Sequence, residues 1–90
     1  MHTQANRDEL LARVRRISGQ VNAIERAITD ESSCAAILHQ VAGVRGALFG
    51  LMDQLLEEHL TDHVANPGLS DSERAQGAED VLAVIRRYAK

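Results

Sequence analysis

Three side chains suited to metal binding lie at the two ends of one long helical pattern. Cys34, the single cysteine of the chain, stands at its start, and His59 and His63 stand at its end. A thiolate and neutral imidazoles are ligands for zinc, nickel and cobalt ions. His59 and His63 are four residues apart, so their rings project from one face of a helix. These residues are the first candidates for a functional site.

The helix that must position these residues also separates them. With about 100° of turn and about 1.5 Å of rise per residue, Cys34 and His59 share a face but lie roughly 37 Å apart along the axis. One chain with an unbroken helix therefore cannot bring them to one ion. Two copies packed antiparallel can, because the start of one helix then lies beside the end of the other. The spacing predicts at least a dimer with two equivalent sites related by a two-fold axis.

Ordinary explanations compete with this interpretation. A histidine pair at helical spacing is by itself weak evidence for a metal site, and a lone cysteine is more often a small buried apolar residue. A catalytic cysteine–histidine pair would need an orienting third group and a pocket. Helices joined by short connections offer little of either, so we expect that the protein is not an enzyme. A metal buffer or chaperone without DNA binding and a plain structural bundle remain as alternatives.

The elements that carry these residues are predicted to be helices only. Apolar residues recur at alternating spacings of three and four, which predicts an all-α chain with helices at about 7–29, 33–64 and 71–88. The connection between the first two helices is short, so they are expected to run antiparallel. The stripe on the first helix is expected to be core, and it consists of Leu10, Val14, Ile17, Val21, Ile24 and Ile28.

Capping residues precede each predicted helix. Asn6 is expected to cap the first helix, and Ser32 or Ser33 the second. Ser70, followed three residues later by Glu73, predicts a capping box at the start of the third helix. The helix starts are therefore specified by local chemistry as well as by the apolar pattern.

Size and composition fit one small domain, residues 1–90, in a reducing compartment. A single cysteine excludes an internal disulfide. No apolar run is expected to span a membrane. The first residues, MHTQANRDE, lack the apolar segment of a signal peptide. We therefore expect a cytoplasmic protein that does not interact with membranes.

The charge distribution indicates a local rather than a general affinity for phosphate. A net charge of −3 argues against a protein that coats nucleic acid without selectivity. A basic cluster nevertheless lies on the first helix, off its apolar stripe, at Arg13, Arg15 and Arg16. These side chains are free to meet solvent or a partner, and a solvated helix face is the plain alternative to a phosphate contact.

Long segments of the chain resemble a known family. The stretch RVRRISGQVNAIERAI, followed by CAAILHQVAGVRGALFGLMDQLLEEHLTDHV, resembles the CsoR/RcnR/FrmR family of small helical bacterial transcriptional repressors, and the likeness extends to VLAVIRRYAK. The resemblance implies an all-α fold without a helix-turn-helix. It implies an antiparallel helical dimer that assembles into a disc-like homotetramer. It also implies that operator DNA binds the metal-free form and that an effector bound between subunits releases it. Arg13 and Arg16 match basic positions of the family and are the expected phosphate contacts, with Arg15 as an additional arginine beside them.

The branches of this family differ at the effector site. Copper(I) members have a cysteine where His63 stands, and formaldehyde-sensing members have an acidic residue there and a proline in place of His2. Nickel and cobalt members have a histidine near the start and then Cys, His and His, a pattern matched by His2, Cys34, His59 and His63. The resemblance thus implies a repressor released by Ni(II) or Co(II), with Zn(II) as a further ion that these ligands could hold. The alternative is a formaldehyde sensor in which Cys34 cross-links to the N-terminal amine.

Overall fold

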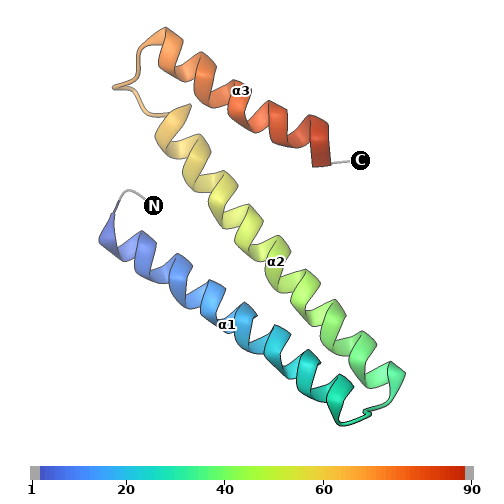
Figure 1. The fold of residues 1–90 in the computed structure, drawn as a ribbon. Helices are drawn as coiled ribbons and strands as arrows, with labels where there is room; N and C mark the ends of the chain where they lie inside the picture. Colours follow the sequence, from blue (N-terminus) through green and yellow to red (C-terminus); the bar gives the residue numbers. More distant parts are fainter. Residues whose placement is uncertain (1–2, 89–90) are drawn as a thin grey trace. The chain divides into compact units, whose positions relative to one another are not determined.

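Three α-helices make up the described part of the chain, residues 3–88 of the computed structural model (Figure 1). The helices are α1 (Gln4–Thr29), α2 (Cys34–His63) and α3 (Asp71–Tyr88), and no strand occurs between residues 3 and 88. The all-α prediction is confirmed. The chain divides into two compact units, Met1–Met52 and Asp53–Lys90, and α2 contributes to both.

The start of α1 corrects the prediction for Asn6. The helix begins at Gln4 because Thr3 caps it, and the Thr3 hydroxyl accepts a hydrogen bond from the Asn6 N–H at 3.0 Å. The side-chain amide of Gln4 also donates a hydrogen bond to the Asp8 carboxylate, at 2.8 Å, at the start of the helix. Thr3 and Asn6 are both competent caps. The intervening Gln4 and Ala5 favour helix, so the helix extends to the earlier of the two.

The end of α1 is a Schellman motif that turns the chain toward α2. The N–H groups of Ser32 and Glu31 donate to the carbonyls of Ala27 and Ile28, at 2.9 and 3.1 Å. Glu31 has a φ of 56°, a left-handed conformation in which glycine is the usual residue. Ser33 then caps α2, as predicted, by accepting a backbone N–H at 3.1 Å.

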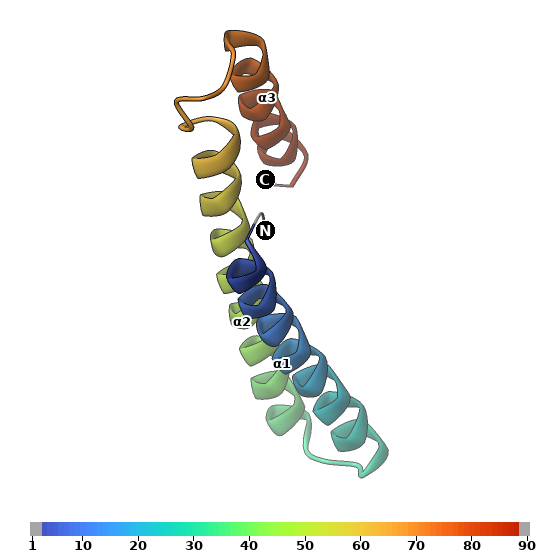
Figure 2. The same ribbon diagram turned by 90° about the vertical axis from the view of Figure 1, so that its left-hand side faces the viewer.

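In the first unit, α1 and the beginning of α2 lie side by side and antiparallel (Figure 1, Figure 2). Only part of the predicted core stripe is covered by this packing. Leu10 and Ile17, with Ala27, are buried on α1. The prediction is wrong for the alternate members of the stripe, which are 45%, 50% and 60% exposed: Val14, Val21 and Ile28. The stripe is wider than the strip that one neighbouring helix covers.

The first part of α2 carries an apolar face that the described residues, 3–88, leave about half exposed. We call it the open face of α2, and it comprises Leu38, Val41, Leu48, Phe49 and Met52. No residue of α2 is buried. By length and composition alone, α2 could cross a membrane, contrary to the sequence-based expectation. Apolar faces of this kind mark association surfaces.

The second unit consists of the end of α2 and α3, joined by residues 64–70. The segment Asn66-Pro67-Gly68 forms a turn in this connection, in which the Gly68 N–H donates to the Asn66 side-chain oxygen at 2.9 Å. The Arg74 guanidinium donates to the Asn66 carbonyl at 3.2 Å. Gly77 is the buried residue of α3.

Ser70 and Glu73 form the predicted capping box at the start of α3. The Ser70 N–H donates to the Glu73 carboxylate at 2.9 Å, and the Glu73 N–H donates to the Ser70 hydroxyl at 3.1 Å. Hydrogen bonds from the Ser70 backbone, and secondarily from its side chain, hold the pKa of Glu73 below its ordinary value. The box therefore stabilises the folded state above the unfolded pKa of Glu73, and this contribution is lost as the pH falls through the folded value.

Ser70→Ala is expected to lower the free energy of unfolding by about 1 kcal/mol at neutral pH, because the Glu73 N–H loses its acceptor. Urea denaturation of the two proteins measures the difference. The Glu73→Gln variant lacks this carboxyl, so its free energy of unfolding should not show the part of the decrease at acidic pH that Glu73 causes in wild type. Equal urea midpoints for wild type and Ser70→Ala would show that the box does not stabilise α3.

Candidate metal centre

The end of α2 brings two of the predicted ligands together. The rings of His59 and His63 have centroids 4.9 Å apart and are tilted by 44°. Both residues are half-buried. Metal–nitrogen bonds are about 2.0–2.1 Å long, so one nitrogen from each ring can reach a single ion. The predicted pair therefore has a geometry that is compatible with shared coordination.

His59 is also held from the side of α3. Its Nε2 atom lies 2.8 Å from the carbonyl oxygen of Gly77. A carbonyl can only accept, so Nε2 carries the hydrogen and donates it. In the neutral ring, the lone pair is then on Nδ1. Nδ1 is consequently the nitrogen of His59 that remains for a metal ion.

Cys34 is a free, exposed thiol at the first position of α2. It belongs to the first compact unit, whereas the histidine pair belongs to the second. Within residues 3–88 of one chain, no three His, Cys, Asp or Glu side chains gather into a group that could hold a metal ion. α2 is one element from Cys34 to His63, which is the premise of the two-chain site. His2 lies outside the described residues.

The chemistry of these donors fits a divalent ion of the nickel, cobalt and zinc group. The donors are two neighbouring imidazoles and one accessible thiol. In His59, a hydrogen bond selects the ring nitrogen that remains for a metal ion. Ions of this group bind nitrogen and sulfur ligands of these kinds in proteins. A second chain would have to supply part of the set.

The arginine cluster on α1 divides into two kinds of residue. Arg15 and Arg16 are exposed, whereas Arg13 is half-buried. The Nη1 atom of Arg13 lies 2.6 Å from where a Cβ of Gly50 would be, so the missing side chain at Gly50 makes room for the Arg13 guanidinium. The expectation that Arg13 is as free as its neighbours is corrected: it packs against α2.

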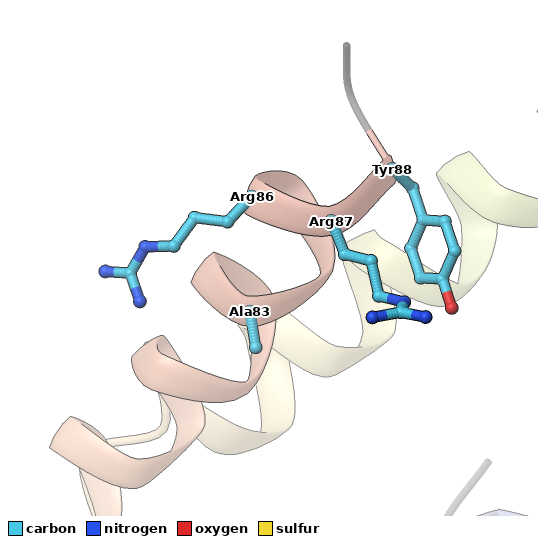
Figure 3. Close-up of a pocket in the computed structure, with 4 residues that line it drawn as sticks. All are labelled: Ala83, Arg86, Arg87 and Tyr88. Atoms are coloured by element: carbon cyan, nitrogen blue, oxygen red, sulfur yellow. The ribbon is translucent and has the colours of Figure 1, made fainter.

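The last turn of α3 gathers further basic side chains for which the sequence predicts no site role. Ala83, Arg86, Arg87 and Tyr88 line a shallow pocket (Figure 3). Arg86 Nη1 forms an ion pair with Glu79 Oε1 at 2.9 Å, and the Arg87 guanidinium lies 5.7 Å from the centre of the Tyr88 ring. The sequence IRRY shows two adjacent arginines, but only the structure shows that both line one pocket.

Comparison with known protein sequences gives relatives that match almost end to end. Residues 6–87 match the family model described as metal-sensitive transcriptional repressor. The chain is 46% identical over 89 residues to an uncharacterised Serratia marcescens protein from the region 5′ of bioA, covering 99% of this chain and 98% of that one. It is 36% identical over 89 residues to the transcriptional repressor RcnR of Salmonella arizonae, with the same coverage.

Solved structures agree with the sequence relatives. A glutamate-to-histidine variant of the formaldehyde-responsive regulator FrmR from Salmonella enterica serovar Typhimurium is 41% identical, with a TM-score of 0.91 over 98% of this chain and 99% of that one. The copper-sensing repressor CsoR of Geobacillus thermodenitrificans, solved with Cu(I), is 29% identical, with a TM-score of 0.89 over 100% and 93%. The matched family is one of transcriptional repressors, and RcnR, FrmR and CsoR are regulators by name, which confirms the expectation that the chain is not an enzyme. The chain belongs to the family of metal-sensitive transcriptional repressors.

Proposed function

We propose that this protein binds operator DNA in its metal-free form and releases it when Ni(II) or Co(II) binds. The observation that carries the proposal is the imidazole pair of His59 and His63, 4.9 Å apart, in a chain of the metal-sensitive repressor family. The likeness to RcnR over 99% of this chain supports the nickel and cobalt branch, because the sequence resemblance associates RcnR-like members with these metals. His63 itself argues for this branch, because the sequence resemblance associates cysteine at that position with copper and an acidic residue with formaldehyde.

The ligands would come from two chains. Cys34 of one chain would supply a thiolate, and His59 and His63 of another would supply two imidazoles. His2 would be the fourth ligand. Such a set suits Ni(II) and Co(II), while Zn(II) could be held by the same four groups in a tetrahedron. The bound ion would supply a link between the chains.

The open face of α2 supports the assembly that this site needs. Its residues are 45–63% exposed in the single chain. We propose that a second copy covers it in an antiparallel dimer, and that dimers form a disc-like homotetramer in the cytoplasm. A lipid bilayer is the poorer occupant, because Arg45 stands in the middle of this helix and a charge is costly within the hydrocarbon layer.

Arg13, Arg15 and Arg16 are the proposed DNA contacts. Arginine side chains that contact phosphates position a protein on the DNA backbone but do not read its sequence. Repetition in four chains multiplies a modest patch, so binding should weaken steeply with salt. The ion can release the DNA only if it binds more tightly to the shape that binds DNA less well.

An electrophoretic mobility assay tests the proposal. The metal-free protein selects its operator from random-sequence duplex DNA, and the complex is then titrated separately with Ni(II), Co(II), Zn(II) and formaldehyde. We expect release by Ni(II) and Co(II), with a coupling factor in the range of about 5–150-fold that is typical of allosteric regulation. Failure of the metal-free protein to select any DNA at low salt would refute the repressor function, and release by formaldehyde alone would refute the metal effector.

Formaldehyde is the alternative effector, and the likeness to a formaldehyde-responsive regulator favours it. The chain is 41% identical to a variant of a formaldehyde-responsive regulator, and Cys34 is an exposed free thiol. In this alternative, the Cys34 sulfur adds to formaldehyde, and the N-terminal amine then displaces water to form a methylene bridge. The two effectors leave different products, since the bridge is covalent and would persist after a chelator removes every metal ion.

A further inference from the structure

We propose that Gly77 is a positioning residue of the metal centre. Its carbonyl fixes His59 in the tautomer that presents Nδ1 to the metal, and its missing side chain lets α3 come close enough to do so. This inference rests on the proposed function for its consequence at the metal, but its structural part concerns the metal-free protein alone.

The hydrogen bond is well formed and directional. His59 Nε2 and the Gly77 carbonyl oxygen are 2.8 Å apart in a half-buried contact. Gly77 lies inside α3, where one lone pair of its carbonyl serves the helix. The second lone pair is available to the imidazole. The acceptor is backbone, so it is present whatever side chains surround the ring.

Close packing explains the glycine. A Cβ on residue 77 would overlap the carbonyl oxygen of His63, and it would lie 2.8 Å from the carbonyl carbon and 3.0 Å from the Cβ of His63. The first two of these are backbone atoms, which cannot rotate away as a long side chain could. Any side chain at this position would therefore push α3 away from the turn that carries both histidines.

Conformational freedom does not explain the glycine. No glycine between residues 3 and 88 has a positive φ, so an alanine could adopt the backbone of Gly77. Glycine inside a helix is less favourable than alanine by about 1 kcal/mol. The chain nevertheless has glycine at the buried residue of α3, where the methyl group of an alanine would remove the contact with His59.

The consequence concerns the ligand nitrogen. A histidine that binds a metal through one nitrogen usually donates the other N–H to a carbonyl or carboxylate, and loss of that second group costs about 10–100-fold in metal affinity. Gly77 would fill this role for His59. Without it, the ring is free to rotate and to exchange tautomers, and Nδ1 is no longer selected.

Two measurements on the full-length protein test the inference. The first is ¹⁵N NMR of the imidazole rings in metal-free wild type, at a pH where the ring of His59 is neutral. We expect hydrogen on Nε2 and none on Nδ1. The second is Co(II) affinity and the Co(II) absorption spectrum of Gly77→Ala. We expect affinity to fall by about 10–100-fold, with altered ligand-field bands and mixed tautomers in the metal-free form.

The matched control is Gly19→Ala, which adds the same methyl group where nothing lies within 4 Å. It should keep the wild-type tautomer and Co(II) affinity. Hydrogen on Nδ1 of His59 in wild type overturns the inference even if Gly77→Ala does not fold. Unchanged Co(II) affinity and spectrum in a folded Gly77→Ala also overturn it. If wild type binds no Co(II), the proposed function fails, while the tautomer measurement still decides the role of Gly77.

Discussion

Cys34→Ser is expected to weaken Ni(II) and Co(II) binding by more than about 100-fold, since even groups that only orient a ligand contribute about 10–100-fold. The substitution replaces a thiolate by a hydroxyl, which is a poor ligand for these ions. Cys34 is free and exposed, so the folded chain should tolerate the change. DNA binding by the metal-free protein should persist, and metal-dependent release should disappear.

Ala35→Ser is the control for this experiment, because it introduces the same hydroxyl at the neighbouring exposed position of α2. Chelator competition gives the affinities, and the sulfur-to-cobalt charge-transfer band reports the thiolate directly. If Cys34→Ser keeps the band and the affinity of wild type, Cys34 is not a ligand and the two-chain site is wrong.

His63→Glu separates the two effectors that Cys34→Ser cannot distinguish. The variant loses one of the paired imidazoles but keeps the exposed thiol. Metal-dependent release should therefore weaken, while release by formaldehyde, if it exists in wild type, should remain. Retention of full nickel sensitivity would remove His63 from the proposed ligand set.

Leu48→Glu is expected to dissociate the protein or to prevent it from folding. Leu48 lies on the open face of α2 and is 50% exposed in the single chain. Full burial of an exposed leucine contributes about 1.5–3 kcal/mol. Because Leu48 is already half covered, the interface would add about half of this in each copy, and a two-fold interface contains it twice. The loss of about 1.5–3 kcal/mol per dimer corresponds to a rise of about 10–10²-fold in the dissociation constant, before the cost of burying the new carboxylate.

His39→Glu is the matched control, since it places the same carboxylate on an exposed residue of α2 outside the open face. Sedimentation equilibrium gives the molar mass, and circular dichroism gives the midpoint of thermal unfolding at several concentrations. A Leu48→Glu protein with the mass and midpoint of wild type would show that the open face is not the interface.

The sequence was sufficient for the helices because their signals are local. The apolar period set the helices, and Ser33, Ser70 and Glu73 marked where two of them begin, as the hydrogen bonds confirm. The start of α1 was missed because two capping residues compete there, and the order of Thr3 and Asn6 does not reveal which one the helix reaches.

What the sequence could not predict depends on which surfaces meet. Val14 and Leu10 belong to one apolar stripe, yet Val14 is 45% exposed and Leu10 is 6% exposed, because only a neighbouring helix decides which side of the stripe is covered. Arg13 packs over Gly50 for the same reason. For Gly77, the sequence shows only a glycine inside the third predicted helix. The contact of Gly77 with the turn that carries His59 and His63 explains why a glycine stands there.

The contact at Gly77 also sets a limit on how this chain can evolve. An overlap with a side chain can be relieved by a smaller residue at the second position, but the obstacle here is the peptide backbone of His63, which every amino acid shares. No single compensating substitution at residue 63 can therefore make room for a side chain at residue 77. A lineage that changes the effector by replacing His63 would still inherit the glycine.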